Sequence, residues 1–219
     1  MTNAIESDRR SAIVHTARAL NSTGLTAGAS GNVSVRVPEG FLITPSGLAY
    51  AEMRAEDVVS MDLQGNILSG RQDPSSEWRF HRDIFAQRAD AQAIVHAHSN
   101  YATALACVHR EIPAFHYMVA IAGGDNIRCA PYATFGTQAL SDHALAALSD
   151  RTACLLANHG LIALGQDLDS ALQRALHLEG LAQQYLLTLQ IGEPVILTSE
   201  EMSTVVERFK TYGQANRSQ

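Results

Sequence analysis

The stretch that most constrains this chain is Ala93-Ile94-Val95-His96-Ala97-His98, an apolar segment that carries two histidines two residues apart. Its β-branched residues predict a strand, and alternate side chains of a strand point to the same face. His96 and His98 should therefore lie side by side on one rigid strand, which makes half of a metal site. A His-x-His pair is a weak signal by itself, because most such pairs bind no metal.

Two other positions could complete such a site. Glu77 stands at the start of an expected helix. An acidic residue there can also have a purely structural role, a favourable interaction with the helix dipole. His159 follows a second apolar run, 153–157, and the adjacent Gly160 permits a turn that could aim the imidazole back. Both histidine segments end apolar strands, where the sites of α/β proteins commonly gather. Three imidazoles and one carboxylate suit a divalent ion such as Zn²⁺, with Mn²⁺ or Co²⁺ as alternatives.

Length and composition narrow the class of protein. At 219 residues the chain predicts a single domain over 1–219, and a charged share of only 17% favours burial of surface in an oligomer. A net charge of −6 without a basic patch argues against a nucleic-acid partner. There is no apolar run of membrane-spanning length and no signal-peptide character at the N-terminus, so we expect a cytoplasmic protein without a membrane partner.

Hydrophobic periodicity and turn residues predict a mixture of helices and strands. Helices are expected over 6–21, from residue 75 onward with Ser75 as N-cap, and over 99–109, 137–148, 169–190 and 198–212. Strands are expected over 33–37, 41–43, 57–63, 93–98, 127–131, 153–157 and 161–164. Because several strands are joined by hairpin-length turns, we expect an α/β fold with a largely antiparallel or mixed sheet and helices on both faces.

A second group of residues consists of three short loops rich in small, hydrogen-bonding side chains, at 30–32, 44–47 and 75–76. Each loop alone is ordinary turn chemistry. The third loop also opens the helix beside Glu77, and free N–H groups at a helix N-terminus can bind an anion. If the other two loops converge there, they form a phosphate pocket without Lys or Arg. The chain has no P-loop or dinucleotide motif, so a nucleotide cofactor is not expected.

Five motifs together resemble the class II aldolase/adducin family, in the family's order and over nearly the whole chain. They are Gly28-Ala29-Ser30-Gly31-Asn32-Val33-Ser34, Ile43-Thr44-Pro45-Ser46-Gly47, Pro74-Ser75-Ser76-Glu77, His96-Ala97-His98-Ser99 and Ala157-Asn158-His159-Gly160. The resemblance implies a three-layer α/β/α sandwich around a central, mainly antiparallel sheet, and a homotetramer with active sites at subunit interfaces. It implies Zn²⁺ held by His96, His98 and His159, with Glu77 as fourth ligand and catalytic base.

The resemblance also assigns residues around a sugar-phosphate substrate. It implies a phosphate bound by Gly31, Asn32, Thr44, Ser46, Gly47, Ser75 and Ser76. Tyr117 falls where the aldolases place a catalytic tyrosine supplied by the neighbouring subunit. Tyr212 is a secondary candidate through a looser match to a tyrosine of their mobile C-terminal tail, and His116 is one because it adjoins Tyr117. The remaining histidines, including His81 and His109, are expected in surface or packing roles.

These features predict a metal-dependent aldolase that cleaves a phosphorylated ketose to dihydroxyacetone phosphate and an aldehyde through a metal-stabilised enediolate. The only lysine, Lys210, lies near the C-terminus, which argues against a Schiff-base aldolase. Glu77 stands where the family's epimerases carry Asp, which favours the aldolase branch. Alternatives with the same metal chemistry are a decarboxylase of a 3-oxo sugar-acid phosphate, a sugar-phosphate epimerase and a dehydratase. Alternatives of other classes are a non-enzymatic, adducin-like binding protein and an unrelated zinc hydrolase.

Overall fold

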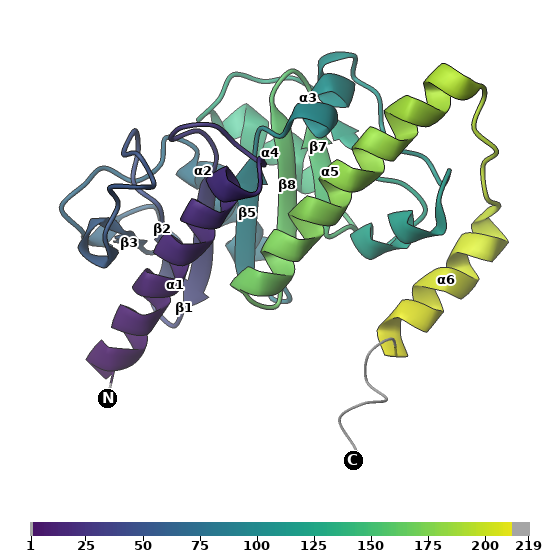
Figure 1. Ribbon diagram of the computed structural model, residues 1–219. Coiled ribbons are helices and arrows are strands. Elements are labelled where there is room, and N and C mark those ends of the chain that lie inside the picture. The colour runs from purple at the N-terminus through teal and green to yellow at the C-terminus, as the bar shows by residue number, and fades with distance from the viewer. Residues whose placement is uncertain (1, 212–219) are drawn as a thin grey trace.

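The computed structural model describes residues 2–211 and has an eight-stranded sheet at its centre (Figure 1). The strands are β1 (Asn32–Val37), β2 (Gly40–Ile43), β3 (Val59–Met61), β4 (Ile67–Ser69), β5 (Ala93–Ala97), β6 (Cys129–Ala130), β7 (Ala153–Leu156) and β8 (Gly160–Gly165). Their order across the sheet is β4-β3-β2-β1-β5-β8-β7-β6. Every neighbouring pair is antiparallel except β6 and β7, which are parallel.

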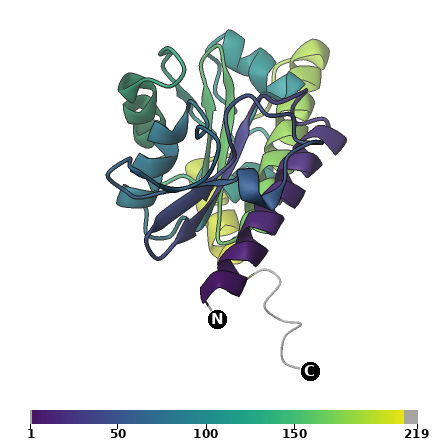
Figure 2. The same ribbon diagram turned by 90° about the vertical axis from the view of Figure 1, so that its left-hand side faces the viewer.

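Helices cover both faces of this sheet. They are α1 (Thr2–Ser22), the short 3₁₀ turn η1 (Ala55–Asp57), α2 (Trp78–Gln87), α3 (Asn100–Cys107), the 3₁₀ segment η2 (Tyr117–Ala122), α4 (Gln138–Ala147), α5 (Leu168–Ile191) and α6 (Ser199–Thr211). Helices α1, α3 and α5 pack on one face, and α2 and α4 pack on the other, as the side view shows (Figure 2). The predicted α/β/α sandwich around a mainly antiparallel sheet is confirmed.

Strand β5 runs through the middle of the sheet and is buried along its whole length. Ala93, Val95 and Ala97 belong to the core beneath α1, α3 and α5, whereas Ile94 belongs to the core beneath α2 and α4. His96 follows the alternation of Ile94, and its ring meets the ring of Phe80 from α2 edge to face at 5.4 Å between centroids. A central strand covered on both faces explains why this segment is apolar on both sides except at its histidines.

The pairing of β5 with its two neighbours brings distant loops to one edge of the sheet. In β1, Asn32 pairs with His96, so the small-residue loop that precedes β1 lies beside the end of β5. On the other side, β8 pairs antiparallel with β5, so the β7–β8 turn that contains His159 reaches the same edge. The sheet therefore gathers loop 30–32, the histidine pair and His159 in one place.

The strand expected over 57–63 is shorter than predicted because side chains bind the backbone at both of its ends. Asp57 belongs to η1, where its carboxylate accepts a 2.9 Å hydrogen bond from the backbone N–H of Arg54. Asp62 accepts bonds from the N–H groups of Gln64 and Asn66 at 2.9 and 2.8 Å, which turns the chain into β4. Such local bonds compete with strand pairing, and β4 is an exposed edge strand without a clear sequence pattern.

The prediction that Ser75 caps the following helix is wrong. Helix α2 begins at Trp78, and Glu77 occupies the N-cap position without a side-chain capping bond. The Ser75 hydroxyl lies outside the helix, where it accepts hydrogen bonds from the side-chain amide of Asn32 at 3.0 Å and from the backbone N–H of Glu77 at 3.4 Å. The strand expected over 127–131 is likewise reduced to β6, with an isolated bridge between Ile112 and Ile127.

Candidate active site

The histidine pair lies as strand alternation predicts. The rings of His96 and His98 are 4.7 Å apart between centroids, and their Nε2 atoms are 2.9 Å apart. The Nδ1–H of His96 donates a 2.8 Å hydrogen bond to the carbonyl oxygen of Leu161 in β8. That bond keeps a proton on Nδ1 and directs Nε2 toward the group, so Nε2 is the atom that would bind a metal.

The chain just after His98 is held by a carboxylate from α5. Glu179 accepts hydrogen bonds from the Ser99 hydroxyl at 2.6 Å and from the backbone N–H groups of Tyr101 and Ala102 at 2.9 Å each. It therefore caps the N-terminus of α3 from outside the helix. The role of Glu179 could not be predicted from the sequence, because its partners are about 80 residues away in the chain and no local pattern reveals them.

His159 reaches the pair through a tight turn between β7 and β8. The turn residue with a left-handed backbone is Asn158, at φ 54°, and not Gly160 as the sequence suggested. The side-chain oxygen of Asn158 bonds to Nε2 of His109 at 2.6 Å, which holds this strained residue in place. Gly160 is required for a different reason: a Cβ at that position would lie 2.3 Å from the carbonyl oxygen of Ala97.

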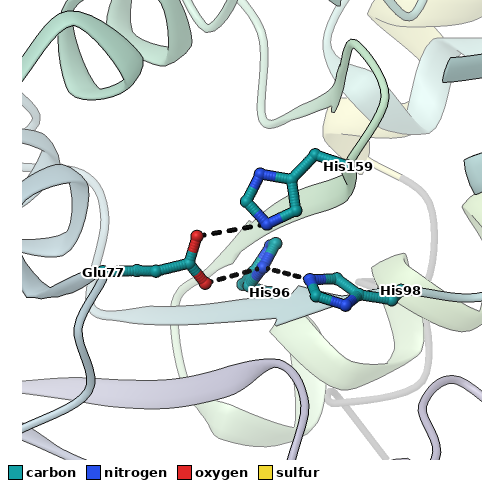
Figure 3. Close-up of side chains that lie close together, drawn as sticks. All are labelled: Glu77, His96, His98 and His159. Carbon is teal, nitrogen blue, oxygen red and sulfur yellow. Dashed lines mark hydrogen bonds and ion pairs between the residues drawn. The ribbon is translucent and has the colours of Figure 1, made fainter. Parts of the chain in front are cut away.

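Glu77 completes the group, and its side chain points between the histidines (Figure 3). Its Oε2 lies 3.0 Å from Nε2 of His96, and its Oε1 lies 3.1 Å from Nε2 of His159. The side-chain amide of Asn32 donates a 2.9 Å hydrogen bond to Oε2. The structure thus brings together Glu77, His96, His98 and His159, with one ligand atom from each, all within 4.8 Å of one another.

The charge states of this group favour a bound cation. Burial raises the pKa of the Glu77 carboxyl, but the contacts with His96 and His159 outweigh burial and hold that pKa well below its usual range. Burial, together with His96 and His159, lowers the pKa of His98 to about 3, so its imidazole is neutral at pH 7. The ionised carboxylate and the neutral imidazole of His98 are the forms in which these residues bind metals. Burial lowers the pKa of His96, but the contacts with the Glu77 carboxylate outweigh burial and raise that pKa, so a proton or a cation is favoured beside this carboxylate.

One buried carboxylate oxygen indicates that these residues suit a bound metal ion. Within the described part of the chain, Oε1 of Glu77 has no hydrogen-bond partner, although it is shielded from solvent. The nearby Nε2 of His159 lies at contact distance from it without a properly aligned hydrogen bond. Buried oxygens left without a donor are costly, and a divalent ion would satisfy this one together with the imidazole lone pairs. The group is able to bind a divalent metal ion.

A cavity of about 330 Å³ opens beside this group. Its wall includes most of the residues expected to bind phosphate: Gly31, Asn32, Ser46, Gly47, Ser75 and Ser76. Backbone hydrogen bonds join two of the three loops, from Ser75 N–H to the Thr44 carbonyl at 3.0 Å and from Ser46 N–H to the Asp73 carbonyl at 2.9 Å. The expected convergence of the three small-residue loops is therefore present next to Glu77.

The structure explains the residue type at two of the positions expected to bind phosphate. Thr44 is fully buried, and its hydroxyl accepts a 3.2 Å hydrogen bond from Val33 N–H, so its side chain supports the wall from behind. Gly31 adopts φ 82°, and a Cβ there would lie 2.6 Å from the carbonyl oxygen of His96. This glycine lets the first loop approach the metal-binding strand closely.

The family model described as Class II Aldolase and Adducin N-terminal domain matches residues 11–186. The chain belongs to the class II aldolase and adducin family.

Relatives within the family are named aldolases. The 5-methylthioribulose-1-phosphate/5-deoxyribulose-1-phosphate aldolase of Rhodospirillum rubrum is 54% identical over 204 residues, which cover 93% of this chain and 92% of the relative. The L-fuculose phosphate aldolase of Escherichia coli strain K12 is 49% identical over 202 residues, covering 92% and 94%. A solved structure of L-fuculose 1-phosphate aldolase superposes with a TM-score of 0.90 at 42% identity and covers 93% of this chain and 96% of that one.

This family membership makes the chain a lyase of the class II aldolase type, whose members use a divalent metal ion. The non-enzymatic, adducin-like alternative is not favoured, because these relatives are enzymes and the described chain contains a complete metal-binding group. Among residues 2–211, no helix combines the length and the apolar character needed to cross a membrane. The single domain, the homotetramer and the cytoplasmic location stay predictions.

Two residues expected near the site, Tyr117 and His116, do not line the cavity of their own chain. Tyr117 begins η2, and its side chain is 51% exposed. His116 precedes it, stacks on the Tyr117 ring at 4.9 Å between centroids, and accepts a hydrogen bond from Met118 N–H. Tyr212 lies outside the described residues. The exposure of Tyr117 leaves its ring free to reach another copy of the chain.

The cavity has an apolar side that the sequence analysis missed. Tyr132, Ala133 and Phe135, from the loop between β6 and α4, line it together with the polar loops. Tyr132 and Phe135 are exposed large aromatic residues in an irregular loop with Pro131 and Gly136. The only sequence signal was the presence of aromatic residues outside any helical or strand pattern.

Proposed function

We propose that this protein is a metal-dependent aldolase that cleaves a phosphorylated ketose to dihydroxyacetone phosphate and an aldehyde. The observation that carries the proposal is the metal-binding group at one wall of a cavity whose adjoining wall is made of hydroxyl and backbone N–H groups. The names of the relatives support the same reaction class, because each contains a sugar 1-phosphate or sugar phosphate and the word aldolase.

In this proposal His96, His98, His159 and Glu77 hold the ion, for which Zn²⁺ is the first candidate. A bound divalent ion acts as a Lewis acid that stabilises the negative charge on the oxygens next to the bond that breaks. The Leu161 carbonyl fixes the ring of His96, and the Asn158–His109 contact supports the turn that carries His159. These partners keep the ligand atoms directed toward one point.

The phosphate would lie against the three loops that surround the N-terminus of α2. Ser46 and Ser76 line the cavity with exposed side chains, and Gly31 and Gly47 bring backbone close to it. Asn32 and Ser75 bond to each other and support the same wall. None of the described lining residues is Lys or Arg, so neutral donors and the helix N-terminus would bind the phosphate.

Proton transfer is assigned to Glu77 and Tyr117. Glu77 borders the cavity with a carboxylate oxygen that no described group hydrogen-bonds, so it would move the proton on the carbon that stays with the phosphate-bearing product. The hydroxyl on the carbon that becomes the aldehyde must lose its proton. Tyr117 of a neighbouring copy would exchange that proton, because Tyr117 lies outside the cavity of its own chain and is exposed.

The apolar wall suggests which aldehydes fit. Tyr132, Ala133 and Phe135 offer no charged group to the cavity, so an aldehyde with an apolar end would fit best. The relative from Rhodospirillum rubrum is named for 5-methylthio and 5-deoxy sugars, which are apolar at carbon 5. We therefore infer a preference for ketose 1-phosphates that lack a hydroxyl at that end.

A coupled assay for dihydroxyacetone phosphate tests this function. The substrates are L-fuculose 1-phosphate, 5-methylthioribulose 1-phosphate and 5-deoxyribulose 1-phosphate, with ribulose 1-phosphate as a matched control that only adds a hydroxyl. We expect cleavage of the deoxy or methylthio sugar phosphates and slower cleavage of the control. Release of CO₂ from a 3-oxo sugar-acid phosphate, or interconversion of pentulose 5-phosphate epimers, without any dihydroxyacetone phosphate would overturn the proposal.

A further inference from the structure

His81 is fully buried on α2, yet both of its ring nitrogens have polar partners. Its Nδ1 lies 2.6 Å from the hydroxyl of Ser34, which is a buried residue of β1. Its Nε2 lies 2.5 Å from the side-chain oxygen of Asn32. The packing role expected from the sequence does not explain these contacts, since an apolar ring of the same size would fill the space without burying two polar atoms.

The direction of each hydrogen bond follows from what the partners can do. The Asn32 side-chain oxygen can only accept, so Nε2 of His81 must carry the ring proton. Burial, aided by the nearby His96, lowers the pKa of His81 to about 3, so the ring is neutral and Nδ1 is an acceptor. The Ser34 hydroxyl therefore donates to Nδ1.

The orientation of Asn32 then determines what Glu77 receives. With its oxygen bound to His81, the Asn32 amide directs its N–H groups to Ser75 Oγ at 3.0 Å and to Glu77 Oε2 at 2.9 Å. The opposite orientation would place the amide oxygen against the ionised Glu77 carboxylate, which also has no proton to donate. His81 thus prevents Asn32 from turning its oxygen toward Glu77.

We propose that His81 is a positioning residue for Glu77 and acts through Asn32, with Ser34 selecting the tautomer of its ring. The proposal rests on the proposed function in that Glu77 is both a metal ligand and the base. His81 itself does not line the cavity among the described residues, so it touches neither the substrate nor the ion. Partners one step behind the ligands of a metal site commonly orient those ligands in this way.

Neutron diffraction from a crystal of the deuterated, metal-loaded wild-type protein tests the tautomer directly. We expect deuterium on Nε2 of His81 and an Asn32 ND₂ group that faces Glu77 and Ser75. A ring with no deuterium on Nε2, or an Asn32 oxygen that faces Glu77, would overturn the proposal. This experiment needs no variant, so it remains decisive even if substitutions at position 81 impair folding.

Two amide substitutions separate positioning from packing. In His81→Gln the amide nitrogen can take the place of Nε2 and still donate to Asn32, whereas in His81→Asn it takes the place of Nδ1 and cannot. His81→Phe retains the ring volume and removes both bonds. We expect His81→Gln to retain most of its metal affinity and turnover. His81→Asn and His81→Phe should each lose roughly 10–100-fold in metal affinity, in turnover or in both.

The measurements are the metal dissociation constant, by competition with a chelator, the thermal midpoint, and kcat and KM separately. Equal losses in His81→Gln and His81→Asn would overturn the proposal, since both place an amide in the same buried space. A wild-type protein that binds metal but cleaves no sugar phosphate would refute the proposed function instead. The neutron result and the metal affinities would still decide the role of His81.

Discussion

Oε1 of Glu77 lies 3.1 Å from Nε2 of His159 without a hydrogen bond between them, although the two residues come from separate loops. A carboxylate oxygen and an imidazole nitrogen that both present lone pairs repel each other unless a proton or a cation lies between them. His96 meets the same carboxylate, because its Nε2 lies 3.0 Å from Oε2 of Glu77 while its Nδ1 proton is donated to Leu161.

Removal of one histidine should release the metal. We expect about one divalent ion per chain in the wild-type protein, and loss of the ion and of activity in His98→Ala, because three remaining ligands hold a catalytic ion poorly. Metal content by mass spectrometry and activity after treatment with a chelator are the measurements. The matched control is His15→Ala, an exposed histidine on α1, which should keep its metal. Full activity in metal-free protein would contradict the prediction.

Substitution of Glu77 by glutamine should strongly reduce proton transfer and leave the fold intact. The change keeps the shape of the side chain but removes the base, so we expect turnover to fall roughly 10²–10⁴-fold while the fold is retained. If Glu77 served only the helix dipole, the substitution would cost about 0.3–1 kcal/mol of stability and leave turnover intact. Asp169→Asn, in the first turn of α5, is the matched control for that simpler role. Near-normal turnover in Glu77→Gln would show that Glu77 serves only the helix dipole.

Loss of a hydroxyl from the small-residue loops should weaken phosphate binding. Ser46→Ala and Ser76→Ala each remove one exposed donor from the cavity wall, so KM for the sugar phosphate should rise about tenfold, the effect of one hydrogen bond to a charged group. Competitive inhibition by inorganic phosphate should weaken in parallel, and Ser203→Ala on α6 should change neither. A substrate without its phosphate that reacts at the same rate would exclude the phosphate site.

Thr44 provides an internal contrast to these serines. Its hydroxyl accepts from Val33 N–H inside the wall, so Thr44→Val leaves a buried donor without a partner. We expect the free energy of unfolding to fall by about 1–3 kcal/mol, with a smaller effect on phosphate inhibition than Ser76→Ala has. Denaturant unfolding and phosphate inhibition, measured on both variants, are the test. A larger loss of phosphate inhibition in Thr44→Val would place this hydroxyl in contact with the ligand.

Tyr117 should act in the site of another subunit. Tyr117→Phe and His96→Ala, each nearly inactive alone, should regain activity when they are unfolded and refolded together, because some mixed neighbours pair an intact metal group with an intact tyrosine. The control mixture is Glu77→Gln with His96→Ala, in which every site has a damaged metal group and no activity should return. Activity that stays at the level of the separate Tyr117→Phe and His96→Ala variants would show that the tyrosine acts within its own chain.

Several features of the site could be predicted from local patterns. Strand alternation places His96 and His98 on one side, and the structure agrees. The three-residue spacing of Thr198 and Glu201 is typical of a helix capping pair, and the structure contains it: Thr198 N–H donates to Glu201 Oε2 at 2.7 Å, and Glu201 N–H donates to Thr198 Oγ1 at 3.2 Å. These predictions succeeded because the interacting groups are within four residues of each other.

Other features could not be predicted because their partners are distant in the chain. The sequence favours Ser75 as the helix N-cap, but its hydroxyl makes its shorter hydrogen bond with the Asn32 amide, and that bond depends on where β1 lies relative to α2. The sequence assigns His81 a packing or surface role, although Ser34 and Asn32 bind both of its nitrogens. In each case a long-range hydrogen bond between buried groups overrides the local preference.

The sequence by itself therefore determined the ligand types, their order along the chain and the face of the strand that carries the histidine pair, because strand alternation and turn preferences act over a few residues. The tertiary structure decided which of these groups meet. The order β1-β5-β8 places Asn32 and His159 on either side of β5, and the packing of α2 on one face of the sheet brings Glu77 and His81 to them. That order follows from burying both faces of the sheet at once, a property of the whole chain that no local segment contains.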